Sequence, residues 1–197
     1  MENVKIVAVG DGMVGKTCML VSYTMGKFPT GYVPTVFENY QAMLMHNAKP
    51  MSVSFWDTAG QEDFDRLRPL SYPNTDCFLV CYSITSEVSL ANIRHRWIPE
   101  IKHYCPTASI ILVGMKSDVR MDKRASAKLE ARGLKMVEEY DAQTLAKEVG
   151  AKGVIECSAK TMYNLDRVVG KAIDCVLEDR KKAQKKAYRS KPVCNIL

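Results

Sequence analysis

Short apolar runs alternate with longer amphipathic stretches along the chain. The short runs have the length and β-branched content of buried strands, and they are Val4–Val9, Val53–Trp56, Cys77–Tyr82, Ile110–Val113 and Val154–Cys157. Between them, apolar positions recur at helical spacing in Lys16–Met25, Glu87–Tyr104, Asp141–Val149 and Leu165–Arg180. Strands that alternate with helices predict an α/β fold, in which a mostly parallel sheet carries helices on both faces.

Two further segments extend this pattern. Glu38–His46 is expected to form an antiparallel hairpin with Val53–Trp56, and it brings the predicted sheet to six strands. The segment Met121–Met136 is charged and rich in alanine, which favours a solvated helical insertion over a core element. We therefore expect one domain over residues 1–179, with an extra helix at about 121–136.

Length and composition agree with a single folded domain. The chain has 197 residues, of which 47% are hydrophobic and 25% charged, so it can bury a full core and is not disordered throughout. No stretch approaches the length of a membrane-spanning helix, and the first residues do not form a secretory signal. The seven cysteines include no Cys-x-x-Cys pair, so we expect reduced core residues in a cytosolic protein.

The net charge of +6 comes from the carboxyl-terminal segment. Residues 180–197 contain seven basic residues and no acidic one, which leaves 21 basic and 22 acidic residues, a net charge of −1, in residues 1–179. We expect residues 180–197 to form a flexible polybasic tail. Its last four residues, Cys-Asn-Ile-Leu, fit the C-a-a-X signal, and the final leucine favours a geranylgeranyl group on Cys194.

A lipid and a basic cluster together supply the two signals that stable binding to an anionic membrane surface needs. Nucleic-acid binding is not expected from this tail, because Tyr188 is its only aromatic residue. A contribution of residues 180–186 to nuclear localisation stays open.

Candidate chemistry lies in the loops after the predicted strands, where ligands bind in parallel α/β sheets. Residues 10–17 follow the first strand and fit G-x-x-x-x-G-K-[ST]. Backbone N–H groups of such a loop cradle a polyphosphate, while Lys16 reaches the β- and γ-phosphates and Thr17 ligates Mg²⁺. The predicted nucleotide-binding residues of this phosphate loop are Gly10, Asp11, Gly12, Met13, Val14, Gly15, Lys16, Thr17 and Cys18.

The loop after Val53–Trp56 carries Asp57, Gly60 and Gln61. Asp57 ends a buried strand beside the phosphate loop, where it can hold the Mg²⁺ shell through water. The N–H of Gly60 can approach a γ-phosphate, and Gln61 can orient an attacking water. With the phosphate loop, these residues predict hydrolysis of a nucleoside triphosphate.

Two more loops indicate which base is bound. The carboxylate of Asp118 only accepts hydrogen bonds, so it matches the adjacent N1–H and amino donors of guanine rather than adenine. The stem of Lys116 could cover the base. The loop of Ser158, Ala159 and Lys160 could bring a backbone N–H to guanine O6. A nucleotide kinase or an ATPase is the alternative enzyme class, and these two loops argue against it.

With these motifs the chain resembles the Ras superfamily of small GTPases, and within it the Rho/Rac family. The resemblance covers essentially the whole chain, and it is most specific in Tyr32–Tyr40 and Trp56–Pro73, which look like the two Rho-family switch segments. The insertion at Met121–Met136 matches the extra helix of Rho proteins. The resemblance implies a P-loop GTPase that uses Mg²⁺, converts GTP to GDP, and signals to effectors in actin regulation.

The resemblance also implies partners and a location. The partners would be guanine-nucleotide exchange factors, GTPase-activating proteins, a dissociation inhibitor, and effector kinases or scaffolds. The protein itself would be a monomer. The protein would reside on the cytoplasmic face of the cell membrane, with a cytosolic pool. No residue in the motifs is an obvious arginine finger, so intrinsic hydrolysis should be slow and activating proteins should stimulate it.

Residue roles follow from the same resemblance. Phe28 would pack against the base, Tyr32 would cover the phosphates, and Thr35 would ligate Mg²⁺ and sense the γ-phosphate. The implied catalytic residues are Gln61, Lys16, Thr35 and Gly12. A side chain at Gly12 would crowd Gln61. The surface read by partner proteins would be formed by Val36, Phe37, Glu38, Asn39, Tyr40, Phe64, Arg66 and Leu67.

Two residues depart from the family pattern, and a third has two possible roles. Met115 stands where the family has Asn or Thr and cannot donate a hydrogen bond, so our hypothesis is that it loosens nucleotide binding and speeds exchange. If exchange were very fast, the protein would be an adaptor that is largely loaded with GTP. Phe64 replaces the Tyr of many Rho proteins with little change in volume. Cys18 could be a redox-sensitive thiol, since helix N-termini lower thiol pKa values, or a packed residue beside the phosphates.

Overall fold

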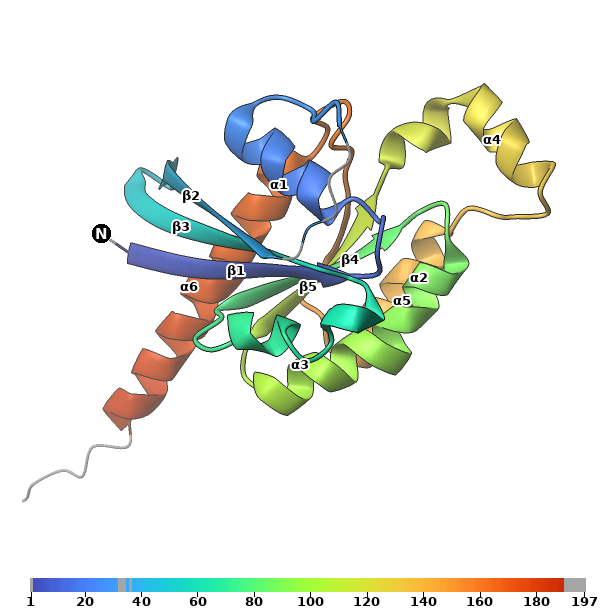
Figure 1. Ribbon diagram of the computed structural model, residues 1–197. Helices are drawn as coiled ribbons and strands as arrows, with labels where there is room; N and C mark the ends of the chain where they lie inside the picture. Colours follow the sequence, from blue (N-terminus) through green and yellow to red (C-terminus); the bar gives the residue numbers. More distant parts are fainter. Residues whose placement is uncertain (1, 32–34, 36, 190–197) are drawn as a thin grey trace, which may run out of the picture.

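A six-stranded sheet forms the centre of the molecule (Figure 1). The computed structural model describes residues 2–31, 35 and 37–189. The strands, in the spatial order β2-β3-β1-β4-β5-β6, are β1 (Glu2–Gly10), β2 (Phe37–His46), β3 (Lys49–Thr58), β4 (Cys77–Ser83), β5 (Ser109–Met115) and β6 (Val154–Glu156). Neighbouring strands pair in parallel except β2 and β3, which form the predicted antiparallel hairpin. The predicted fold class is confirmed.

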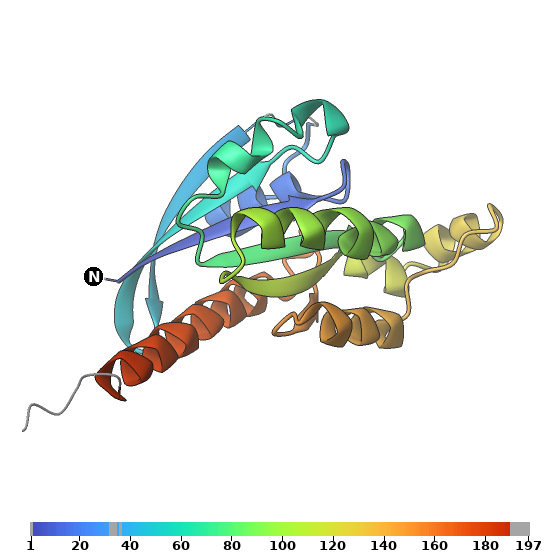
Figure 2. The same ribbon diagram turned by 90° about the horizontal axis from the view of Figure 1, so that it is seen from below.

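Helices cover both faces of this sheet (Figure 2). On one face, α1 (Lys16–Met25) and α6 (Leu165–Arg189) enclose a core that includes Ile6 and Ala8 of β1. On the other face, α2 (Glu87–Asn92), α3 (Ile98–Tyr104) and α5 (Glu139–Val149) enclose a core that includes Val7 and Val9. Successive residues of β1 serve opposite cores because side chains of a strand alternate between its faces.

The helix predicted over Glu87–Tyr104 forms, but it contains a π-helical turn at Ile93–Trp97 between α2 and α3. Pro99 explains this turn, because its ring would clash with the carbonyl of His95 in a regular α-helix. A wider turn avoids the clash, as in other π-bulges. The turn also directs Asn92 and Trp97, five residues apart, toward the same side.

Helix α4 (Lys123–Glu130) lies within the predicted insertion and projects away from the sheet (Figure 1). The side chain of Asp122 caps it by accepting from the N–H groups of Arg124 and Ala125 at 3.0 and 3.1 Å. None of the residues in α4 is buried. The helix therefore forms from local signals and stands outside both cores.

Helix α6 is longer than the sequence pattern predicts. We expect its end at Arg180, and this boundary is wrong because the helix continues through Arg189. The segment Lys-Lys-Ala-Gln-Lys-Lys-Ala after Arg180 consists of strong helix formers and has no glycine or proline. The described part of the basic segment is thus helical rather than a flexible tail from residue 180 onward.

The cysteines that the structure describes are all free, and they are Cys18, Cys77, Cys81, Cys105, Cys157 and Cys175. Most of them lie in the cores, and burial raises the pKa of the Cys77 and Cys81 thiols. Free, mostly buried thiols agree with the prediction that the cysteines are reduced core residues. Within residues 2–31, 35 and 37–189, no helix combines the length and apolarity needed to cross a membrane.

Candidate nucleotide-binding site

A cavity lies at the carboxyl ends of the parallel strands. It is located at β1, where the strand order of the sheet reverses. Strand β1 pairs with β3 on one side and β4 on the other, and such a switch point is where open α/β sheets bind ligands. The phosphate loop, residues 10–17, leaves β1 here and leads directly into α1. The cavity measures about 510 Å³, and its lining includes Gly12, Lys16, Thr17, Gly60 and Gln61.

Lys16 is held inside the phosphate loop. Its Nζ donates to the carbonyl oxygens of Gly10 at 2.8 Å and Asp11 at 2.9 Å, and the residue is only 6% exposed. Burial lowers its pKa from the ordinary lysine value. A buried cation whose own hydrogen bonds go to loop carbonyls is already positioned for an incoming phosphate.

Three side-chain oxygens converge beside Lys16. The hydroxyl oxygens of Thr17 and Thr35 are 2.7 Å apart, and the Thr35 hydroxyl donates to Oδ2 of Asp57 at 3.3 Å. Asp57 is fully buried, and its Oδ1 has no hydrogen-bond partner. Burial raises the pKa of Asp57, while the hydroxyl of Thr17 and the charge of Lys16 act against this shift.

This oxygen set fits Mg²⁺, which takes few protein oxygens and completes its shell with water and phosphate oxygens. The unpartnered Oδ1 of Asp57 is an acceptor ready for a metal-bound water. Among the described residues, no group of three or more His, Cys, Asp or Glu could hold a metal ion. The predicted Mg²⁺ residues Thr17, Thr35 and Asp57 thus come together without an acidic cage.

Glycines bring the loop after β3 against the phosphate loop. A Cβ on Gly60 would lie 2.4 Å from backbone atoms of residues 10–12, so no side chain fits there. A Cβ on Gly12 would lie 3.7 Å from Cγ of Gln61, which is ordinary contact for a methyl group. A longer side chain at Gly12 would displace Gln61, as the resemblance implies.

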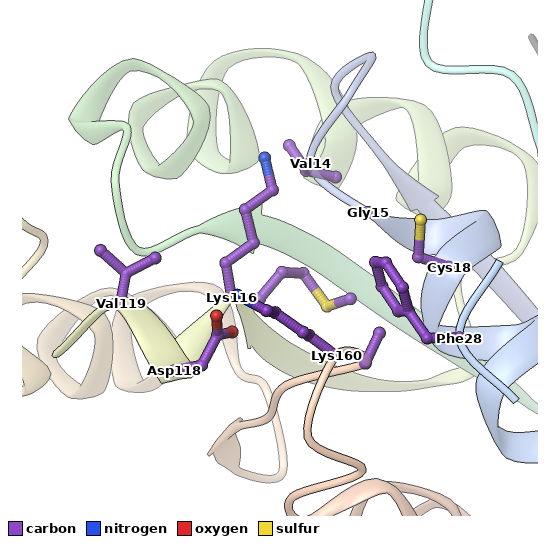
Figure 3. A pocket seen from close by; sticks show the side chains of 10 residues that line it. Val14, Gly15, Cys18, Phe28, Lys116, Asp118, Val119 and Lys160 are labelled. Carbon is purple, nitrogen blue, oxygen red and sulfur yellow. The ribbon is translucent and has the colours of Figure 1, made fainter. Parts of the chain in front are cut away.

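A smaller cavity of about 210 Å³ adjoins the first (Figure 3). Phe28, Lys116 and Asp118 line it, together with Ala159 and Lys160. The predicted base-binding residues are therefore brought together at one place, beside the phosphate loop.

Two hydrogen bonds fix the loops around this smaller cavity. Ser158 donates to Oδ1 of Asp118 at 2.7 Å, and Nζ of Lys116 donates to the carbonyl of Met13 at 2.9 Å. Lys116 adopts a left-handed conformation with φ of 65°, which is uncommon for this residue type. Burial lowers the pKa of Lys116. The base loop is thus tied both to the loop of Ser158 and to the phosphate loop.

Cys18 lines both cavities, at the start of α1. Burial raises the pKa of its thiol, and the nearby charge of Lys116 offsets only part of this rise. The helix N-terminus therefore does not make Cys18 an acidic thiol. Of the two interpretations of this residue, the structure favours a packed residue beside the phosphates.

The loops that are predicted to bind phosphate, metal, water and base thus meet at one edge of the sheet. The sequence profile of the Ras family matches residues 5–178. The chain belongs to the Ras family. It is a small GTPase, a switch that binds GTP and GDP with Mg²⁺ and hydrolyses GTP. Proteins of this family interact with exchange factors, GTPase-activating proteins and effectors.

In this Ras-family GTPase, the side chain of Asp11 faces the π turn rather than the cavity. Its Oδ1 accepts from Nε1 of Trp97 at 2.8 Å, and its Oδ2 accepts from Nδ2 of Asn92 at 2.7 Å. Asp11 can contact nucleotide through its backbone, while its carboxylate ties the phosphate loop to the end of α2 and to the π turn. The sequence pattern does not reveal Asn92 and Trp97, although Pro99 within a helical pattern signals an irregular turn.

Arg68 is a second structural contact of the GTPase site that the motifs do not reveal. The residue is 3% exposed, and its guanidinium donates to the carbonyl of Ala59 and to both carboxylate oxygens of Glu100, each at 2.9 Å. It also donates to Asp65 at 2.6 Å. The backbone just before Gly60 is therefore anchored to α3.

Arg96 adds a second connection from the π turn to the segment after Gln61. Its guanidinium donates to Glu62 at 2.6 Å and to Asp65 at 2.7 Å. The guanidinium carbons of Arg96 and Arg68 each lie 4.6 Å from the ring of Trp97, which is cation–π distance. The residues that flank Gln61 and those that hold Asp11 thus share one network.

The predicted partner surface is largely exposed. Phe37 and Leu67 are 43% and 53% exposed, and the Phe37 ring packs edge-on against Trp56 at 4.9 Å. Glu38, Asn39 and Arg66 are exposed as well, while Tyr40 and Phe64 are half-buried. The hydroxyl of Tyr40 donates to Glu38. Three predicted residues lie outside the described part of the chain, and they are Tyr32, Val36 and Cys194.

Proposed function

We propose that this GTPase is a Rho-type switch, anchored to the cytoplasmic face of the cell membrane, that signals in regulation of the actin cytoskeleton. The observation that carries the Rho assignment is helix α4 (Lys123–Glu130), a projecting element inside the charged insertion. The switch segments Tyr32–Tyr40 and Trp56–Pro73 support the same assignment. Cys194 and the basic residues that precede it support the membrane anchor.

Hydrolysis uses groups of this chain to hold GTP and position water. Mg²⁺, when bound, would be held by Thr17 and Thr35 and through water by Asp57, and it would neutralise charge on the β- and γ-phosphates. Lys16 stabilises the same phosphates, and Gln61 orients a water for in-line attack on the γ-phosphorus. No arginine lines the phosphate cavity among the described residues, so intrinsic hydrolysis is slow.

The switch works through contacts that only GTP provides. The γ-phosphate holds the N–H of Thr35 and the N–H of Gly60, and its loss on hydrolysis releases both segments. Exchange factors, activating proteins, a dissociation inhibitor, and effector kinases or scaffolds read this change through residues 37–40 and 64–67. The exposed apolar side chains of Phe37 and Leu67 supply contact area for such partners.

Single-turnover hydrolysis of GTP tests this function. The purified protein is measured alone, with a Rho-type GTPase-activating protein, and with a Ras-type activating protein as the matched control. We expect the Rho-type activator, through its arginine, to accelerate hydrolysis about 10³–10⁵-fold and the Ras-type activator to leave it unchanged. Acceleration by the Ras-type activator alone would contradict the Rho assignment.

Met115 favours a second candidate function, a fast-exchanging and largely GTP-loaded adaptor. The side chain is 1% exposed at the end of β5, where it offers no hydrogen-bond donor to the loops around the base. Such an adaptor would release GDP rapidly without an exchange factor. Gly12 and Gln61 are both present, however, so hydrolysis itself remains competent in either case.

A further inference from the structure

Helix α4 carries a serine among basic residues. Ser126 is partly exposed, and Lys123 and Arg124 stand three and two positions before it. Lys128 follows two positions after it. Protein kinases select their substrates by complementary charge, so a kinase whose substrate groove carries carboxylates favours a serine that follows basic residues. Ser126 therefore has the surroundings of a substrate for such a kinase.

The helix that holds Ser126 opens easily. It projects away from the sheet (Figure 1), it has eight residues, and none of them is buried. Isolated helices of this length are marginal in water, because few hydrogen bonds offset the entropy lost in forming the first turn. A segment with few buried contacts also opens locally without global unfolding. Helix α4 can thus present Ser126 to a kinase in an extended form while both cores stay folded.

A phosphate on Ser126 would lie between two carboxylates. Asp122 and Glu130 stand four residues before and four residues after Ser126, on the same face of the helix. Phosphoserine carries a charge of about −1.5 to −2 at pH 7, and like charges at this spacing destabilise a helix. Lys123, three residues before Ser126, offsets only part of this repulsion.

The same phosphate would act against the cap of α4. The Asp122 carboxylate accepts from the N–H groups of Arg124 and Ala125, and the Asp122 carbonyl accepts the N–H of Ser126 at 2.9 Å. The amino-terminal end of the helix, which favours an anion, is therefore already occupied by the Asp122 carboxylate. Repulsion between this carboxylate and a phosphate one turn away weakens the contacts with which the helix begins.

We propose that Ser126 is a phosphorylation site and that its phosphorylation unwinds α4. In this step the Ser126 oxygen attacks the γ-phosphorus of ATP bound to the kinase. The new oxygen–phosphorus bond forms, the bond from the γ-phosphorus to the oxygen that leaves with ADP breaks, and the hydroxyl proton passes to a base of the kinase. Helix α4 is then an element that folds or unfolds under the control of a kinase, whichever nucleotide is bound.

Phosphorylation also changes the charge of the projecting segment. Met121–Met136 contains five basic and two acidic residues, which gives a net charge of +3, and the phosphate lowers it to about +1. The residues counted are Lys123, Arg124, Lys128, Arg132 and Lys135 against Asp122 and Glu130. Both the shape and the charge of this surface are therefore altered by one modification.

Phosphate incorporation tests the first part of the proposal. The full chain, loaded with GDP and Mg²⁺, is incubated with ATP and the catalytic subunit of cyclic-AMP-dependent protein kinase, and mass spectrometry locates the phosphate. We expect it on Ser126, and Lys123→Gln combined with Arg124→Gln should slow its incorporation at least about tenfold, since charge-assisted contacts with the kinase are lost. Ser86 is the matched control and should stay unmodified, because it is partly exposed at the start of α2 but follows Ile84 and Thr85.

Hydrogen exchange of the phosphorylated protein, followed by nuclear magnetic resonance, tests the unwinding. We expect the amides of residues 126–130 to exchange about threefold faster than in the unmodified protein, and those of α5 to be unchanged. Glu130→Gln removes one of the two repulsions, so the phosphate should accelerate exchange less in this variant. Hydrolysis of GTP should be unchanged, because no residue of α4 is buried or lines either cavity.

Three results would overturn the inference. The first is the absence of phosphate from Ser126 in the unchanged protein. The second is equal incorporation in the variant that lacks the charges of Lys123 and Arg124. The third is exchange in the phosphorylated helix that is unchanged or slower, which would mean that the phosphate does not unwind α4. All the substituted residues are exposed, so the variants are expected to fold.

Discussion

At the scale of single residues, the site depends on positions where a side chain is absent or lacks a polar group. Gly60 has backbone on every side, and Gly12 has just enough room for a methyl group before Gln61 is reached. Met115 has no hydrogen-bond donor, and its Cε would lie 3.7 Å from a Cβ placed on Gly15. Gly12 and Met115 each give a prediction about one step of the GTPase cycle.

Replacement of Gly12 by valine should separate binding from hydrolysis. A Cβ alone would be in contact with Gln61 at 3.7 Å, so the two methyl groups of valine would displace Gln61 and crowd an incoming arginine. We expect Gly12→Val to bind GTP and to lose stimulation by an activating protein. Gly12→Ala is the smaller control, and wild-type stimulation of Gly12→Val in a single-turnover assay would refute this placement of Gln61.

Met115→Thr should slow the release of GDP. Threonine restores a hydroxyl between the base loop and the phosphate loop, and a hydrogen bond of ~1 kcal/mol corresponds to a roughly fivefold slower off-rate. The measurement is the release of a fluorescent GDP analogue in excess unlabelled GDP. Equal off-rates for Met115→Thr and the unchanged protein would contradict the hypothesis that Met115 loosens nucleotide binding.

At the scale of elements, the π turn between α2 and α3 joins two loops of the site. Asn92 and Trp97 hold the carboxylate of Asp11, and Arg96 holds the segment after Gln61. Arg68 completes the connection from that segment to Glu100 of α3. These side chains share partners, so one network of contacts connects the segment after Gln61 to the phosphate loop.

Arg68→Ala should destabilise the whole domain. The buried guanidinium makes four hydrogen-bonding contacts to three residues, and its removal leaves the Glu100 carboxylate without its cation. Breaking a buried ion pair in this way costs about 3–5 kcal/mol in the free energy of unfolding. Urea denaturation at a fixed excess of GDP and Mg²⁺ measures the change.

The neighbouring Arg66→Ala provides the matched control for Arg68→Ala. Arg66 is exposed, so its removal should change the free energy of unfolding by no more than about 0.5 kcal/mol. Equal effects of the two substitutions would mean that the contacts of Arg68 contribute nothing beyond those of a surface charge.

At the scale of the whole molecule, basic charge gathers at two distant places. Helix α4 projects at one end, and the carboxyl-terminal end of α6 lies at the opposite end (Figure 1). Lys181, Lys182, Lys185 and Lys186 are exposed on α6, whereas Arg180 donates to Asp76 at 2.9 Å and to the Asn3 carbonyl at 2.8 Å. Arg180 is therefore partly structural, and the four exposed lysines are the charge that the proposed membrane anchor would use.

Replacement of these four lysines by glutamine should detach the protein from membranes and leave GTP hydrolysis unchanged. Each basic residue near an anionic surface contributes ~1 kcal/mol, and one lipid alone anchors weakly. Fractionation of cells that express the variant measures the membrane-bound share. Neutralising Lys123, Arg124 and Lys128 of α4 is the control, since this helix lies at the other end. Undiminished membrane binding of the α6 variant would show that its charge is not the second signal.

Much of the fold and site follows from sequence, because strand and helix periods are local and the GTPase motifs lie in loops directly after strands. The strands, α1 and the β2–β3 hairpin form where they are expected, and α4 occupies Lys123–Glu130 within the segment predicted as an insert helix. The predicted end of α6 at Arg180 is wrong, because the charge of the chain changes there while its helix propensity continues to Arg189. The π turn and Arg68 are not foreseen, because both depend on partners distant in sequence.

The sequence alone determined the order of the elements, the positions of the loop motifs that are predicted to bind phosphate, metal and base, and the carboxylate that is predicted to select guanine. These features depend on residue type and spacing within short segments. Only the tertiary structure decided that Asp11 faces Trp97, that Arg68 is buried against Glu100, and that Met115 reaches Gly15. The physical reason is that burial and hydrogen-bond pairing depend on what folding brings near, and no local pattern along the chain encodes those neighbours.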